Sequence, residues 1–368
     1  MVDSTTTLLF VIKSGVIILA IGLVALTLRS VVRTLVLPRS ANDLVVSALF
    51  RLLRRLFQAG MHFADTYRER DQLLAYFAPV GLLLLVPTWL CVILIAFAGL
   101  FWATGMETIY EALTLSGSSL FTLGFKMHDT PLHMLFSFIE AALGMMIVAL
   151  LIGYLPTMYA AFSLREAAVN QLDVRAGTPP TVSELVRRAH QIGKLGDMNQ
   201  FWREWELLFT QIAESHTTLP ALVYFRSPLG DRSWVTAAGS VLDAAAFMRS
   251  TVAVRRDPQA DLCIRAGYLA LRQIADYYGL SYDADPQYPA NPVSIDRSEF
   301  DAVYAELLTA DVPLVSDRDQ AWLDFAGWRV NYDRVLLALC ALTAAPYAPW
   351  SSDRSLLPEA TTGRRERR

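Results

Sequence analysis

The stretch from Leu73 to Trp102 contains no Asp, Glu, Lys, Arg or His residue, and it constrains the fold more than any other part of the sequence. A helix needs about 20 apolar residues to cross a bilayer. Two further stretches meet this criterion: Leu8 to Leu28, with Lys13 as its one charged residue, and Leu132 to Leu164, with Glu140. The sequence therefore predicts an all-α membrane protein with three spans.

Charge is distributed unevenly, which separates a membrane part from a soluble part. The chain is 54% hydrophobic and 18% charged, with 32 basic and 35 acidic residues. Most of these charges follow residue 164, where we expect a mainly helical soluble domain without a strongly basic surface for nucleic acid. Cys91, Cys263 and Cys340 show no paired spacing, so a zinc site and a disulfide framework have no support.

Basic residues predict the orientation in the membrane. Arg29, Arg33 and Arg39 follow the first span, and Arg165 and Arg175 follow the third. Positive flanking segments stay on the cytoplasmic side, so we expect the N-terminus outside and the C-terminal domain in the cytoplasm. The first span has no basic segment before it and no cleavage site after it, so we interpret it as a retained anchor rather than a signal peptide.

The connector between the first two spans, residues 29–72, is basic. Its middle part has apolar residues at helical spacing, with arginines on the other face. This pattern is typical of a helix on the inner membrane surface. An amphipathic helix packed on the protein itself fits the pattern equally well.

The segment between the second and third spans, residues 103–131, is too polar for a span and too apolar for an ordinary surface loop. Thr104 and Glu107 have the spacing of a capping box, which predicts the start of a helix too short to span. This helix gives way to "TLGF", Thr122 to Phe125. Non-helical backbone at membrane depth must be buried in protein or line an aqueous cavity, so we expect a re-entrant pore loop.

The order span, short helix, "SSLFTLGF", span resembles the bacterial two-transmembrane pore-loop ion channels related to potassium channels (ion-transport-2 type). Residues 122–125 match the first four positions of their filter, which reads T-V-G-Y-G with T-L-G-F-G-like variants. The third span is similar to their pore-lining helix, which often reads E-A-L-x-G, and Glu140 and Gly144 fall on that pattern. The resemblance covers roughly residues 73–164.

This resemblance implies a homotetramer that passes monovalent cations, potassium or sodium, without any cofactor. The carbonyl oxygens of Thr122, Leu123, Gly124 and Phe125, with the Thr122 hydroxyl, would replace the hydration shell of the cation. Gly124 allows the positive φ that such a filter needs.

Three residues of the inner helix are candidates for gating. Glu140 is expected either to bond the pore helix from behind the filter or to face the cavity, where it would attract cations or gate with pH. Gly144 and Gly153 are expected to be hinges or tight packing positions.

The chain also departs from the family pattern. Lys126 replaces the last filter glycine, Met127 the usual aspartate, and Phe121 the usual first threonine. Four lysines at the mouth would oppose a cation by about 2 kcal/mol in bulk water, or about 8 kcal/mol at an effective dielectric near 20. The outcome depends on whether Lys126 reaches water or pairs with Asp129. Two alternatives stay open: an anion-permeable pore with a Lys126 ring, and a non-conducting membrane receptor or scaffold.

The sequence of the soluble part indicates no particular ligand. It has no G-x-G-x-x-G or GxxxxGK[ST] motif and no catalytic spacing, so neither a nucleotide-binding fold nor an enzyme is expected. A helix start is predicted at Thr181. An anionic ligand framed by His216, Arg226, Arg232 and Trp234 is a hypothesis beside the commoner alternative, a packed core or turn cluster.

We thus expect an oligomeric cation channel of a bacterial cytoplasmic membrane, modulated by its C-terminal domain. The bacterial source rests on the resemblance and on an arginine-rich composition, since only Lys13, Lys126 and Lys194 are lysines. The expected divisions are an anchor (1–28), a connector (29–72), a pore module (73–164, with the pore loop at 104–130), a helical cytoplasmic domain (165–358) and a disordered tail (359–368).

Overall fold

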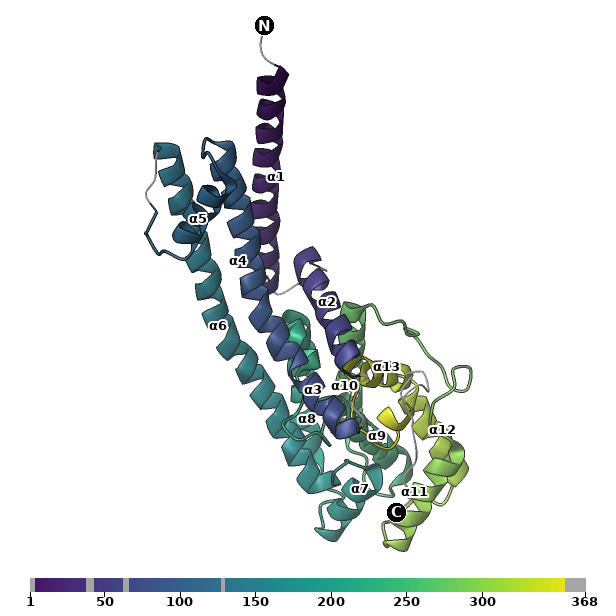
Figure 1. Ribbon diagram of the computed structural model, residues 1–368. Coiled ribbons are helices and arrows are strands. Elements are labelled where there is room, and N and C mark those ends of the chain that lie inside the picture. Colours follow the sequence, from purple (N-terminus) through teal and green to yellow (C-terminus); the bar gives the residue numbers. More distant parts are fainter. Residues whose placement is uncertain (1–3, 38–42, 62–65, 127–129, 355–368) are drawn as a thin grey trace. The chain divides into compact units, whose positions relative to one another are not determined.

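The computed structural model describes residues 4–37, 43–61, 66–126 and 130–354, and these residues form helices (Figure 1). No β-sheet occurs among them; a single antiparallel bridge joins Val252 and Leu314. The chain divides into two compact units, Met1–Ala160 and Ala161–Arg368, here called the first and the second unit.

The first unit is built around α4, which packs against α1, α2 and α5. Trp89 of α4 is fully buried, and its indole N–H donates to Ser30 Oγ of α1 at 3.0 Å. The helices of this unit are α1 (Ser4–Leu35), α2 (Leu44–Met61), α3 (Tyr67–Ala75), α4 (Phe77–Ala103), α5 (Ile109–Leu120) and the first part of α6 (Pro131–Ala176).

Among the described residues, three helical segments are long and apolar enough to cross a membrane: Thr7–Leu35, Glu69–Ala103 and Pro131–Ala176. They contain the three predicted spans, and they indicate a multi-pass membrane protein. The bounds differ from the prediction in three places. The first span was expected to end at Leu28, but α1 continues to Leu35. The second span was expected from Leu73, but Tyr76 separates α3 from α4 there.

The third span was expected to end at Leu164, yet α6 continues to Ala176. No glycine or proline interrupts the sequence after Pro156, so the helix ends only at Gly177, which adopts a φ of +80°. At that φ a residue with a side chain is strained, which makes glycine the common residue after a helix end.

One face of α2 packs on the protein. Its Phe50 and Phe57 rings meet Phe77 edge-on, at centroid distances of 5.8 and 5.4 Å. Arg51, Arg54 and Arg55 of the same helix are exposed. Of the two possibilities that the sequence left open, packing on the protein accounts for the aromatic face of α2.

The second unit surrounds α9, whose residues are buried on almost every side. Its small side chains let neighbouring helices approach; a Cβ on Gly239 would lie 2.8 Å from Leu336 Cδ2. The helices are the end of α6, α7 (Val182–Gln191), α8 (Asn199–Thr218), η1 (Pro220–Tyr224), α9 (Trp234–Thr251), α10 (Pro258–Tyr278), α11 (Arg297–Thr309), α12 (Arg318–Arg329), α13 (Asp333–Thr343) and η2 (Ser352–Arg354).

The predicted start of a helix at Thr181 is confirmed. The Thr181 hydroxyl caps α7 by accepting a hydrogen bond from the Glu184 N–H at 3.3 Å. This capping satisfies one of the backbone donors that a helix leaves open at its first turn.

Candidate functional site

The short helix of the expected pore loop is α5, which has 12 residues and begins later than predicted. Its cap is Thr108, whose hydroxyl accepts from the Glu111 N–H at 3.1 Å. The predicted capping box of Thr104 and Glu107 is therefore wrong. Thr104 instead follows the end of α4, where its hydroxyl donates to the Leu100 carbonyl at 2.7 Å. Gly105, at a φ of +135°, turns the chain after α4, so the next helix begins further along the sequence.

After α5 the backbone leaves helical geometry over residues 122–125, the expected filter segment. Gly124 has a φ of +69°, as predicted. Thr122 also has a positive φ, +56°, which is costly for a β-branched residue. Leu123 and Phe125 have 62% and 63% of their surface exposed in the single chain. The segment is thus strained, and its apolar side chains lie outside the core of its own chain.

The N–H groups of this segment are held by the end of α5, with Thr122 donating to the Ser119 carbonyl at 3.0 Å and the others donating to Ser118. Its carbonyl oxygen accepts from the Leu123 N–H at 2.8 Å, and its hydroxyl accepts from the N–H groups of Phe125 and Lys126 at 3.1 and 3.3 Å. Within the described residues, no hydrogen bond reaches the carbonyl oxygens of residues 122–125. The backbone therefore has its donors occupied, whereas its acceptors are not bonded by the described residues.

Two further serines attach α5 to its neighbours. The Ser116 hydroxyl lies 2.9 Å from the Leu94 carbonyl of α4 and 2.5 Å from Glu140 Oε1 of α6. The Ser119 hydroxyl donates to Ser137 Oγ of α6 at 2.9 Å. Sequence reasoning missed these roles. The signal was present in "SGSS", because polar side chains in an apolar setting need partners on adjacent helices.

Glu140 and Gly144 both bring α6 close to α5. Glu140 is completely buried; Ser116 contacts its Oε1, and its Oε2 has no hydrogen-bond partner in the described part of the chain. A Cβ on Gly144 would lie 2.8 Å from the Leu120 carbonyl oxygen, whereas a Cβ on Gly153 would meet nothing within 4 Å. Of the expected roles, the contact of Glu140 with the short helix and the tight packing at Gly144 are observed.

Lys126 forms an ion pair within the loop. Its Nζ lies 3.7 Å from Glu111 Oε1 of α5, and about a third of the lysine side chain (32%) is exposed. Asp129, the partner considered from the sequence, lies outside the described residues. Glu107, which precedes α5 in the chain, is exposed.

The polar cluster expected in the second unit is only partly assembled. His216 is fully buried, with its ring centroid 4.7 Å from that of Trp234. Arg165 Nη1 lies 3.2 Å from His216 Nε2, so this nitrogen is the acceptor and the histidine is neutral. Burial and the charge of Arg165 lower the pKa of His216 well below its usual value. Arg226, Arg232 and Trp234 instead line a small surface pocket, which does not include His216.

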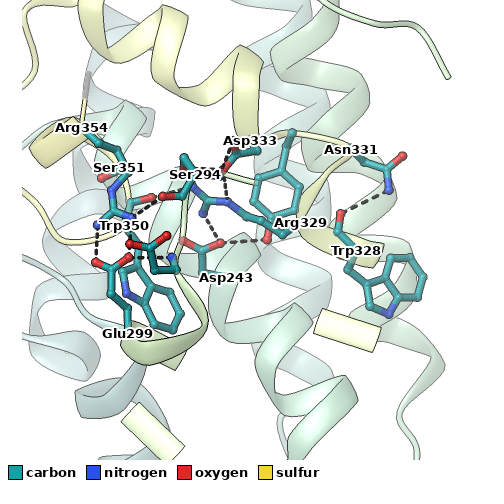
Figure 2. Close-up of polar contacts among 12 residues, drawn as sticks. Asp243, Ser294, Glu299, Trp328, Arg329, Asn331, Asp333, Trp350, Ser351 and Arg354 are labelled. Atoms are coloured by element: carbon teal, nitrogen blue, oxygen red, sulfur yellow. Dashed lines mark hydrogen bonds and ion pairs between the residues drawn. The ribbon is translucent and has the colours of Figure 1, made fainter. Parts of the chain in front are cut away.

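A buried polar network of the second unit centres on Arg329 (Figure 2). Its Nε donates to Asp333 Oδ1 at 2.7 Å, its Nη2 to the Trp350 carbonyl at 2.6 Å, and its Nη1 to Asp243. The Tyr332 hydroxyl also donates to Asp243, at 2.9 Å. Burial alone would lower the pKa of Arg329, but the two carboxylates outweigh it and raise that pKa. The network joins α9, α12 and α13 and has a structural role.

No protein-family model, no curated protein and no solved structure matches this chain. Among the described residues, no group of three or more His, Cys, Asp and Glu side chains is placed to hold a metal ion. The candidate functional site is therefore defined by its own geometry: the C-terminal end of α5, residues 122–125, and the part of α6 that contacts α5.

Proposed function

We propose that the protein is a pore-loop channel for monovalent cations, potassium first, in a membrane of bacterial type. One observation carries this proposal. The segment 122–125 has its N–H groups held by Ser118 and Ser119, while its carbonyl oxygens accept no hydrogen bond from the described residues. Carbonyl oxygens that are free in this way are the ligands with which a filter replaces the hydration shell of a cation.

The helices around this segment support the proposal. The helix α5 is too short to span, and it lies between two helices that are long enough. Because the C-terminal end of a helix carries a partial negative charge, α5 would favour a cation near residues 121–124. Glu140, buried behind α5, would hold the short helix in position rather than bind the ion.

Several chains are needed to complete such a filter, because one chain supplies only one strand of carbonyl oxygens. The resemblance to pore-loop channels implies four chains. The exposure of Leu123 and Phe125 is consistent with further chains around them, since such side chains are unfavourable in water. In the proposed orientation the N-terminus lies outside and the second unit lies in the cytoplasm.

Lys126 is less of an obstacle to cations than its sequence position implies. Its ion pair with Glu111 offsets the positive charge that four copies would bring to the mouth. The same pair weighs against a ring of lysines that selects anions. Cation passage is therefore the preferred function, and anion passage is an outcome that the experiment distinguishes.

The experiment is ion flux from proteoliposomes loaded with potassium, sodium or chloride salts, using Gly124→Ala and a matched control. Gly193 in the second unit has the same φ of +69°, and neither glycine has an atom within 4 Å of an added Cβ. Both alanines therefore cost about 1–2 kcal/mol of local strain. We expect Gly124→Ala to lower potassium flux by at least about tenfold, because filter carbonyls must keep their orientation. Gly193→Ala should leave the flux unchanged.

Other results would change the assignment. Chloride flux that Lys126→Gln removes would move the function to the lysine ring. No flux in any salt, even from Lys126→Gly, would contradict the channel and favour a membrane receptor or scaffold. An equal loss of flux in both glycine variants would show that the effect of Gly124→Ala is general instability.

A further inference from the structure

A small pocket opens on the second unit between residues 223–234 and the end of α13. Its free volume is about 280 Å³, counting the part open to solvent. Its polar lining comes from Arg226, Ser227, Arg232 and Ser233. The lining offers two guanidinium groups and two hydroxyls.

Ser227 provides the first indication of a ligand. The residue is 93% buried, with 7% of its surface exposed. Its Oγ has no hydrogen-bond partner in the described part of the chain. Buried hydroxyls are nearly always hydrogen-bonded, because removing them from water without a partner is costly. A polar group bound in the pocket would give this hydroxyl a hydrogen-bond partner.

The start of α9 provides the second indication. Arg232, Ser233 and Trp234 all line the pocket, and Ser233 is the cap of this 18-residue helix. The Ser233 hydroxyl accepts from the Val235 N–H at 3.3 Å. The first turn of a helix presents further N–H groups and a partial positive charge, an arrangement that binds phosphate groups and other anions.

The two arginines of the pocket are held by neighbouring elements. Arg226 Nη2 donates to the carbonyls of Thr343 and Ala344, at 2.9 and 2.8 Å. Arg232 Nε lies 2.5 Å from Asp173 Oδ2 of α6, yet neither atom forms an aligned hydrogen bond among the described residues. Arg232 Nη1 also donates to Asn170 of α6.

Two carboxylates oppose an anion at this place. Asp173 contacts Arg232, and Asp231, which precedes it in the chain, is exposed. An anion in the pocket would therefore share the charge of Arg232 with Asp173. Because Asp173 lies on α6, a shift of that helix would change the ion pair at the pocket. A change in the ion pair would in turn act on the position of α6.

We propose that this pocket binds a single phosphate group, either as inorganic phosphate or as the phosphate of a small metabolite. The Ser227 hydroxyl donates to one of its oxygens, the first turn of α9 donates backbone N–H groups to it, and Arg232 supplies the charge. Binding draws Arg232 from Asp173 and so weakens a contact on α6. The effect of this change on ion flux rests on the proposed channel function, whereas the binding itself does not.

The test measures binding to the purified full chain in detergent, by isothermal titration with inorganic phosphate and, separately, with glycerol 3-phosphate. Chloride at equal ionic strength is the reference. We expect saturable binding of at least one phosphate compound. Binding of glycerol 3-phosphate alone identifies a metabolite as the ligand, and binding of inorganic phosphate shows that the phosphate group suffices.

Variants test the residues. Ser227→Ala removes an unpartnered hydroxyl, so it should not lower the stability of the protein, but it should weaken binding about tenfold. Arg232→Gln should weaken binding by at least as much. Ser316→Ala and Arg265→Gln, at exposed positions away from the pocket, are the matched controls and should bind as the parent does.

No binding in either titration would overturn the proposal. So would an unchanged dissociation constant in both Ser227→Ala and Arg232→Gln. Because these measurements need no ion flux, their failure is separate from failure of the channel. If binding occurs and the parent protein conducts, phosphate should change the flux of the parent and leave that of Arg232→Gln unchanged.

Discussion

The two units bury ionisable side chains in different ways. In the second unit, Arg329 is surrounded by two carboxylates and a carbonyl oxygen. In the first unit, Glu140 is equally buried but meets only the Ser116 hydroxyl, and no cationic side chain of the described residues pairs with it. Arg329 is thus compensated by carboxylates, whereas among the described residues Glu140 meets a single neutral group.

This difference separates a structural network from a candidate functional one. A buried ion pair that is fully bonded holds elements together, and removing one partner leaves the other uncompensated. A carboxyl within an apolar helix that has an open oxygen is costly, and such groups in membrane segments commonly serve function. We therefore expect substitutions of Arg329 and of Glu140 to change the stability of the protein by different amounts, although the two side chains are equally buried.

The largest expected effect is that of Arg329→Met. Asp243 and Asp333 would stay buried without their cation, which should cost about 4 kcal/mol of unfolding free energy. For a unit of this size the thermal midpoint of the full chain in detergent should fall by roughly 10 °C. The midpoint can be followed by tryptophan fluorescence.

Two variants sharpen this comparison. Arg256→Met removes a pair with Asp261 in which the arginine is 62% exposed, and it should cost less than about 1 kcal/mol. Glu140→Gln retains an oxygen for Ser116 and should also change stability by less than about 1 kcal/mol. A loss at Glu140→Gln as large as that at Arg329→Met would contradict the difference between the units.

The next effect concerns two glycines on the same helix. Gly144→Ala places a Cβ 2.8 Å from the Leu120 carbonyl oxygen, so α5 must shift, at a cost of about 2 kcal/mol. Gly153→Ala meets no atom and should stabilise the helix by up to about 1 kcal/mol. Thermal midpoints of the two variants measure the contrast. Equal midpoints would mean that the packing of α5 on α6 is loose.

The smallest expected effect is the pH dependence due to His216. Its pKa is lowered in the folded protein by burial and by Arg165, so below about pH 6.5 the unfolded chain binds a proton that the folded chain does not. This contribution to stability is complete above that pH and declines as the pH falls, by up to about 1.4 kcal/mol per pH unit. His216→Gln should therefore lose less stability than the parent between pH 7.5 and 5.5. If the thermal midpoint of His216→Gln fell as steeply with pH as that of the parent, His216 would be excluded as the source of the pH dependence.

Local sequence was sufficient for several parts of the candidate site. A helix too short to span and the positive φ of Gly124 were predicted because each depends on a few neighbouring residues. The start of α5 was misplaced by one turn, since Thr104 and Thr108 are both followed three residues later by glutamate. Which of the two equivalent signals acts as the cap depended on the end of α4 at Ala103 and on the turn at Gly105, and the capping pattern specifies neither.

The sequence by itself determined the apolar helices and the position of the non-helical segment, because hydropathy and backbone preference are summed over adjacent residues. Only the tertiary structure decided which groups meet. Ser116 meets Glu140 across 24 positions, and Arg329 meets Asp243 across 86. Pairing of this kind depends on how the helices pack, so it cannot be predicted from the spacing of residues along the sequence. Tertiary packing therefore made Arg329 a fully paired structural group and left Glu140 incompletely bonded.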